Sequence, residues 1–335
     1  MLYSIQFARA LAALFVVYFH IAHHVAILPQ FGAFGVDVFF VISGFIIAKV
    51  ASETPQYFFL KRLIRIVPLY WIFTLIVFLV AKINPELFKS TIPTIENLLK
   101  SLFFIPYSGV DDIIKPLYFI GWSLNYEMFF YVMSSILLSL FCRGKFHLSI
   151  TLSLLLVYMF SNLIAPMSIV SRFSGNSLVL EFLIGVLIHK ASSVKYDNQN
   201  PCFAFVIVIL IFSLSSLIYL DWLEYSGLNL FGIISRVIAL GIPSGVFIYS
   251  ILHLEHLFQK ADFVRLLGDS TYSIYLIHPI LIEAIYFIGL RYLALESSNL
   301  YLVVISFFLC LIAGIIVHLY IEKPSIRWVR KLCRL

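Results

Sequence analysis

The stretch FARALAALFVVYFHIAHHVAIL, residues 7–28, decides the fold class of this chain. It is long and apolar enough to cross a bilayer as one α-helix, yet it contains Arg9 and His20. An ionisable side chain at that depth costs at least about 2.5 kcal/mol, so it usually serves a function. These two residues are therefore the first candidates for a functional site.

Arg9 and His20 are spaced so that they face the same way. They are eleven positions apart, which at about 100° per residue returns them to nearly the same helix face, about 16 Å apart along the axis. One face thus carries a permanent cation near one membrane surface and a titratable imidazole beyond the midplane. This arrangement suits an anionic cofactor that enters from one side and reacts at greater depth. The alternative is that His20 is a packed histidine bonded to a neighbouring helix.

The composition of the whole chain indicates a membrane protein. Hydrophobic residues make up 62% of the chain and charged residues 12%, far from the roughly 25% of charged residues in soluble domains. The four cysteines form no CxxC pattern, so neither a disulfide framework nor a metal site is predicted. We predict an all-α polytopic integral membrane protein with about ten transmembrane helices, at residues 5–28, 34–51, 66–83, 118–141, 147–166, 176–190, 202–220, 229–252, 270–290 and 299–320.

The cations are distributed unevenly between the two sides of this predicted topology. With the N-terminus inside, fifteen Lys and Arg residues fall in cytoplasmic segments and six in outer segments, which leaves Arg9 and Arg236 within spans. The positive-inside rule then places both termini in the cytoplasm. The net charge of +6 is explained by topology, and we expect no nucleic-acid partner. The outer segment 84–116 is interpreted as an extracytoplasmic lid, a re-entrant piece or an irregular surface loop.

The second predicted span opens with GVDVFFVISGF, residues 35–45, and places Asp37 near its outer end. If the first and second spans run antiparallel, Asp37 lies within roughly two helical turns of the depth of His20 in the membrane. A carboxylate there could hold the imidazole in one tautomer and stabilise its protonated form, as a general base requires. The alternative is that Asp37 only caps the start of its helix.

Further charged residues lie at or within the third and fourth predicted spans. Arg62 and Arg65 are spaced i, i+3 and share a face at the inner mouth of the third span. Guanidinium groups suit phosphate, although ordinary cytoplasmic flanking charge is the alternative. Glu127 is an intramembrane carboxylate that needs a partner or a water-lined cavity, and Arg236 is one structural candidate for that partner.

In the ninth predicted span, Tyr272, Tyr275 and His278 recur every three residues and form a polar stripe on one helix side. Pro279 removes the hydrogen bond to the Tyr275 carbonyl and permits a kink.

Together these segments resemble the membrane-bound acyltransferase family 3. The similarity is spread in family order across most of the chain. The opening of the chain, QFARALAA (residues 6–13), and the short length of the chain look most like the branch of this family that O-acetylates exopolysaccharide and O-antigen. The matching pieces are Arg9-x10-His20, the stretch 35–45, Arg62-x-x-Arg65-Ile-x-Pro68-x-Tyr70-Trp71, Trp122-Ser-Leu-x-x-Glu127 and Tyr272-Ser-Ile-Tyr-Leu-x-His278.

The resemblance implies a single transmembrane acyltransferase domain over residues 1–335, without an appended soluble domain, in the bacterial inner membrane. The family takes acyl-CoA, usually acetyl-CoA, from the cytoplasm and O-acylates glycans at or beyond the membrane. We therefore expect acyl-CoA as a co-substrate, no permanently bound cofactor and no metal. The expected partners are acyl-CoA, a glycan acceptor that could be lipid-linked, the lipid bilayer and polysaccharide-assembly proteins.

The resemblance also assigns roles to residues. His20 would be the catalytic histidine, as a general base or as a transient acyl-histidine, and Arg9, Arg62 and Arg65 would bind the donor. Asp37 and Glu127 are the further catalytic candidates. Substrate contacts are expected from Trp122, Tyr272, Tyr275 and His278.

Two other functional classes share part of this pattern. A lipid-linked glycan flippase or polymerase would also be polytopic and basic inside, but it would need no inward-facing arginine cluster aligned with a deep histidine. A structural or sensory membrane protein would bind neither donor nor acceptor.

Overall fold

The computed structural model describes residues 2–84, 92–109, 112–141, 143–163, 168–194, 203–258 and 262–333. The predicted all-α class is confirmed: these residues form helices and no β-strand, with one isolated bridge between Ser108 and Ile114. The helices are α1 (Tyr3–His23), α2 (Gly35–Glu53), α3 (Phe58–Ile83), α4 (Ile95–Leu102), α5 (Trp122–Leu140), α6 (Phe146–Leu163), α7 (Ile169–Ser174), α8 (Val179–Val194), α9 (Phe203–Leu223), α10 (Leu230–Ile233), α11 (Ile242–Leu252), α12 (Glu255–Phe258), α13 (Asp262–Tyr292), α14 (Leu300–Val317) and α15 (Lys323–Leu332).

Within the described ranges, eight helices are long and apolar enough to cross a membrane. The chain is therefore a multi-pass membrane protein. Two predicted spans are not among the eight. The segment 118–141 corresponds to α5, whose first two turns are polar, and 229–252 corresponds to the shorter apolar helix Val237–Leu252. The count of ten spans and the cytoplasmic position of both termini stay predictions.

The helices pack into two compact units that interleave along the chain. Unit 1 comprises Met1–Ile46 and Leu180–His318, and unit 2 comprises Ile47–Val179 and Leu319–Leu335. The expectation of one domain over residues 1–335 stays a prediction.

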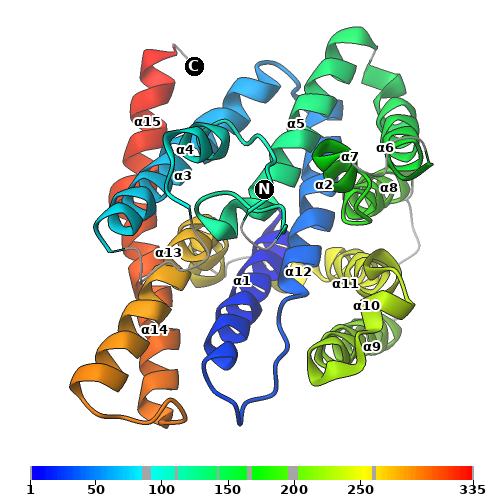
Figure 1. Cartoon of the computed structure of the whole chain (residues 1–335). Coiled ribbons are helices and arrows are strands. Elements are labelled where there is room, and N and C mark those ends of the chain that lie inside the picture. The colour runs from blue at the N-terminus through cyan, green and yellow to red at the C-terminus, as the bar shows by residue number, and fades with distance from the viewer. Residues whose placement is uncertain are drawn as a thin grey trace. The chain divides into compact units, whose positions relative to one another are not determined.

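In unit 1, α13 packs against both α1 and α14 (Figure 1). The contacts along α1 show that α1 and α13 run in the same direction. Gln6 near the start of α1 bonds Asp269, and His20 near its end contacts His278. Residue numbers thus rise together along the two helices. The two parallel helices bring polar side chains from distant parts of the sequence together.

The start of each of the first two helices is held by a carboxylate from a distant segment. Glu255 accepts hydrogen bonds from the backbone N–H groups of Tyr3 and Ser4, at 2.8 Å each. Asp221 of α9 accepts from the N–H groups of Gly32 and Phe34, at 2.6 and 3.3 Å, just before α2. The Glu255 contact satisfies amides that the first turn of α1 leaves unpaired, and both carboxylates place negative charge near the positive end of a helix dipole.

Unit 2 contains the outer segment whose structure the sequence left open. Residues 85–91 and 110–111 of it lie outside the described residues. The described part contains α4, which packs against α3. The indole of Trp71 donates to the carbonyl of Leu102 at 2.9 Å, and the rings of Tyr70 and Phe104 stack with centroids 4.8 Å apart. Part of this segment is therefore an ordered helix on α3.

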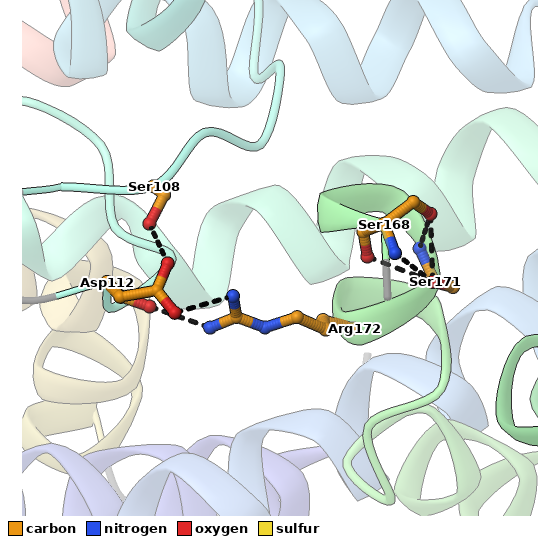
Figure 2. A network of polar contacts seen from close by, with 5 residues as sticks. All are labelled: Ser108, Asp112, Ser168, Ser171 and Arg172. Atoms are coloured by element: carbon orange, nitrogen blue, oxygen red, sulfur yellow. Dashed lines mark hydrogen bonds and ion pairs between the residues drawn. The ribbon is translucent and has the colours of Figure 1, made fainter. Parts of the chain in front are cut away.

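Figure 2 shows how the same segment is tied to α7. The guanidinium of Arg172 donates to the Asp112 carboxylate at 2.8 Å and to the Asp112 carbonyl at 2.7 Å. The Ser108 hydroxyl donates to the other carboxylate oxygen at 2.6 Å. Ser168 and Ser171 form a reciprocal capping box at the start of α7, which fixes the helix that carries Arg172.

Helices α2 and α8 approach so closely that only glycine fits at two positions. A Cβ atom on Gly44 would lie 2.0 Å from the Phe182 carbonyl oxygen, and one on Gly185 would lie 2.0 Å from the Val41 carbonyl oxygen. Small residues permit such approaches between membrane helices. Because the obstacle is backbone, a rotamer change cannot relieve it.

We predict that Gly44→Ala and Gly185→Ala each destabilise the protein by about 1–3 kcal/mol, the cost of overpacking a tight contact. Thermal unfolding of detergent-solubilised protein measures the effect. Gly144→Ala is the control, because a Cβ there meets no atom within 4 Å. Equal melting temperatures for all three variants would contradict the close approach.

A second prediction concerns pH. The Ser108 hydroxyl and the Arg172 guanidinium hold the pKa of Asp112 below its usual range. Because the folded-state pKa is depressed, the contact contributes fully above the unfolded pKa of about 3.9 and is lost as pH falls through the lower folded value. Hydrogen exchange in residues 103–109 should therefore rise on acidification and should be raised at neutral pH in Asp112→Asn. Glu96→Gln, which removes an ion pair within α4, should leave this exchange unchanged. Unchanged exchange in Asp112→Asn would rule out the tether.

Candidate active site

A pair of imidazoles from α1 and α13 lies at the centre of the polar contacts in unit 1. The Nε2 atom of His278 is 3.3 Å from Nδ1 of His20, and the ring centroids are 4.8 Å apart. His278 is fully buried, whereas His20 is half-buried. His20 is thus the member of the pair that a substrate can reach.

Backbone carbonyls fix the proton positions on the two neutral rings. Nδ1 of His20 lies 2.9 Å from the Val16 carbonyl oxygen, and Nδ1 of His278 lies 3.1 Å from that of Ile274. A carbonyl oxygen only accepts, so each Nδ1 carries the proton. His278 Nε2 then accepts from His20, and Nε2 of His20 carries the lone pair. The arrangement equips His20 to take up a proton at Nε2.

Arg9 lies nearer the start of α1 and, like His20, faces α13. It is 9% exposed. Its guanidinium donates to Gln6 at 3.1 Å and to the Thr271 hydroxyl at 2.9 Å. Gln6 donates in turn to Asp269 at 2.7 Å. Arg9 and His20 therefore both face α13, as the helical spacing predicts.

A third polar contact lies beyond the imidazole pair. His24 Nε2 is 3.5 Å from the Glu283 carboxylate, and the His24 ring stacks on Tyr286 with centroids 4.6 Å apart. The face between α1 and α13 thus carries an arginine, a histidine pair and a histidine–carboxylate pair in succession. The sequence assigned no role to His24 or Glu283.

Asp37 contacts Arg236 rather than His20. Its two carboxylate oxygens accept from Nε and Nη2 of the guanidinium at 2.8 and 2.7 Å. Asp37 is fully buried, and the Glu181 carboxyl group lies beside it. The expectation that Asp37 orients His20 is therefore wrong: a two-pronged guanidinium contact engages both oxygens, and His278 is the partner of the imidazole. A catalytic role for Asp37 stays a prediction.

Unit 2 gathers three of the predicted site residues around Tyr131. The Tyr131 hydroxyl donates to the Glu127 carboxylate. The Arg62 guanidinium lies over the Tyr131 ring, 5.8 Å from its centroid, and Arg65 also acts electrostatically on Tyr131. Both arginines are half-buried.

Arg236 was considered as a partner for Glu127. Within unit 1, Arg236 forms an ion pair with Asp37, and its pairing with Glu127 of unit 2 stays a prediction. The catalytic role of Glu127 and the donor-binding roles of Arg62 and Arg65 stay predictions.

The remaining predicted substrate contacts divide between the units. Tyr275 lies between Phe39 and His278, with ring centroids 6.4 and 5.9 Å away, and Tyr272 is buried. Trp122 begins α5 in unit 2. Tyr275 thus adjoins the imidazole pair, and the roles of all these residues stay predictions.

Sequence reasoning missed two residues that help to build this centre. Thr271 holds Arg9, but a neutral hydroxyl in an apolar helix gives no charge signal. Asp221 is fully buried and anchors the start of α2. It lies one residue beyond the predicted span 202–220, so a slightly longer span would have shown an intramembrane carboxylate.

Comparison with known proteins identifies the family of this chain. A family model described as an acyltransferase domain matches residues 2–319. The chain belongs to acyltransferase family 3. It is 31% identical over 312 residues to the exopolysaccharide production protein ExoZ of Rhizobium meliloti (strain 1021), covering 91% of this chain and 92% of that protein. No solved structure matches. As a family member, the chain is a membrane acyltransferase.

The imidazole contact leads to a prediction about His278. His278→Phe keeps a buried ring but removes the acceptor for the His20 Nδ1–H, so His20 loses one of its two orienting contacts. We expect turnover to fall at least about tenfold, below the roughly 10²–10⁴-fold contribution of a general base itself. His278→Gln, which retains an acceptor, should be less impaired. Wild-type turnover and an unchanged pH–rate profile in His278→Phe would show that the pair is only structural.

Proposed function

We propose that this chain is an O-acyltransferase that moves an acyl group, most often acetyl, from cytoplasmic acyl-CoA to a hydroxyl group of an exopolysaccharide or its lipid-linked precursor. The family match supports acyl transfer, and the printed name of the Rhizobium relative supports an exopolysaccharide acceptor. The observation that carries the proposal is that His278 of α13 orients His20 on α1, the membrane helix that also bears Arg9.

His20 takes the proton of the acceptor hydroxyl at Nε2. The hydroxyl oxygen attacks the thioester carbonyl, the carbon–sulfur bond breaks, and the coenzyme A thiolate takes up the proton. The positive charge on the imidazolium is stabilised because its Nδ1–H already donates to the Val16 carbonyl and to His278. A transient acyl-histidine at the same nitrogen is the alternative route.

The three arginines serve the donor in this proposal. Arg9 is the inward cation on the helix of His20, and its guanidinium is oriented by hydrogen bonds to Gln6 and Thr271. The family resemblance assigns Arg62 and Arg65 of α3 to the donor as well, and guanidinium groups suit phosphate geometry. Trp122 and the two tyrosines of α13 are assigned to the substrates. With cytoplasmic termini and a bacterial inner membrane, these arginines face the compartment that supplies acyl-CoA.

One experiment separates donor binding from catalysis. Arg62→Ala and Arg65→Ala should each weaken coenzyme A binding roughly ten- to a hundredfold, because a charge-assisted hydrogen bond contributes about 1.5–3 kcal/mol. The loss should be smaller for a truncated pantetheine thioester, which lacks the nucleotide phosphates. His20→Ala should bind coenzyme A almost normally while acylation stops. Calorimetry on solubilised variants, beside mass spectrometry of glycan esters, measures both quantities.

Arg291→Ala is the matched control, because this exposed arginine lies at the other end of α13 from Thr271, the residue that contacts Arg9. Near-normal acylation by a correctly inserted His20→Ala variant would eliminate the mechanism. Unchanged coenzyme A affinity in both arginine variants would move the phosphate site elsewhere. A flippase or polymerase would show no coenzyme A binding and no loss of glycan esters when the chain is deleted.

A further inference from the structure

A row of aromatic rings connects His20 to the segment that follows α9. The Phe19 ring lies edge-on to His20, with centroids 5.3 Å apart, and packs against Tyr225 at 4.8 Å. Tyr225 belongs to the helical turn Glu224–Leu228 and is 39% exposed. One ring therefore separates an accessible tyrosine from the imidazole.

Arg236 adjoins the segment that carries this tyrosine: its guanidinium lies over the Phe231 ring, and the Phe231 backbone N–H donates to Glu224 at 2.8 Å. One nitrogen of Arg236 is also available as a hydrogen-bond donor. Asp37 engages its Nε and Nη2 atoms, and Nη1 has no hydrogen-bond acceptor within the part of the chain that the structure describes. The Arg236 side chain is 19% exposed, it interacts electrostatically with Tyr225, and it lies over the Phe231 ring at 5.1 Å. The ion pair and this ring fix the guanidinium in place.

The charge around Arg236 selects against an anionic ligand. The Asp37 carboxylate pairs with this single guanidinium, and the carboxyl groups of Glu181 and Asp221 interact with it electrostatically. Because the Asp37 carboxylate already pairs with this guanidinium, a phosphate group would meet no net positive charge here. A neutral group that accepts a hydrogen bond from Arg236 is favoured instead.

Sugar hydroxyl groups have this chemistry. A hydroxyl accepts from a guanidinium and exchanges hydrogen bonds with a phenol. The C–H faces of a pyranose ring can pack on an aromatic ring, and tyrosine combines that apolar face with a polar end. Tyr225 offers both features beside the Arg236 donor. A sugar seated on them would lie next to the imidazole that activates its neighbouring hydroxyl.

We propose that Tyr225 and Arg236 form a subsite for the acceptor glycan beside His20. This inference rests on the proposed acyl transfer and names the residues that recognise the acceptor. Tyr225 packs a sugar ring and bonds one hydroxyl, and Arg236 donates to a second. Asp37 is then a positioning residue, since it aims the guanidinium without touching the glycan.

The test measures acylation of alkali-deacylated exopolysaccharide fragments by detergent-solubilised variants, with acetyl-CoA as donor. Tyr225→Ala should raise the KM for the fragments about tenfold or more, and Tyr225→Phe, which loses one neutral hydrogen bond, should raise it about two- to tenfold. Arg236→Lys should raise the same KM. The KM for acetyl-CoA should stay at the wild-type value in all three variants.

Tyr219→Ala is the control. Tyr219 lies in α9, the helix that precedes Tyr225, is 58% exposed, and packs its ring against Trp222. Aromatic side chains at this end of a span also serve as membrane-interface anchors, and an anchor would respond alike at both positions. An unchanged acceptor KM in Tyr225→Ala, or an equal change in Tyr219→Ala, would overturn the subsite.

Two further outcomes are informative. If Arg236→Lys does not fold, the two Tyr225 variants decide the question, because an exposed ring can be removed without breaking the buried ion pair. If the wild-type protein acylates no fragment, the proposed function fails. If the wild type acylates and the Tyr225 variants match it, only the subsite fails.

Discussion

The parallel contact between α1 and α13 is the interaction on which the proposed chemistry depends. Lipid is as apolar as leucine, so membrane helices associate through close packing and polar contacts. This contact uses both means. Gly268 lets α1 approach, since a Cβ there would lie 2.6 Å from Gln6 atoms. Hydrogen bonds then hold Arg9 to Thr271 and His20 to His278. The same contacts that join the helices fix the orientation of the guanidinium and of the imidazole.

The ion pair between Asp37 and Arg236 has a different role. Burying two charges costs several kcal/mol per ion, which good geometry and further hydrogen bonds only partly offset. The ion pair therefore serves mainly to position parts of the chain, because it joins α2 to the segment after α10, 199 positions further along the chain. Asp221 adds a second tie between α9 and the start of α2. Together they hold the segment carrying Tyr225 beside α1.

The sequence predicted the helices better than it predicted which side chains contact one another. Apolar runs identify spans because the bilayer requires about 20 apolar residues, and helical spacing placed Arg9 and His20 on one face. Partners depend on which helices meet, and no local pattern contains that information. Asp37 was matched to His20 by depth alone, whereas packing gave it Arg236. His278 was placed on a polar stripe, but its contact with His20 depends on α13 lying parallel to α1.

That parallel arrangement also constrains the topology. Two spans of one chain run in the same direction only when an odd number of crossings separates them. Five of the eight candidate spans lie between α1 and α13: α2, α3, α6, Ile169–Ser192 and Phe203–Leu228. Five is already odd. If all five cross the membrane, any further crossings between α1 and α13 must be even in number. The helix α5 and the helix Val237–Leu252 must then either both cross or both fail to cross. A nine-span chain would reverse α13 and separate His278 from His20. The imidazole contact is thus compatible with eight or ten spans in the described part of the chain, and either number would put both of its ends on the same side of the membrane.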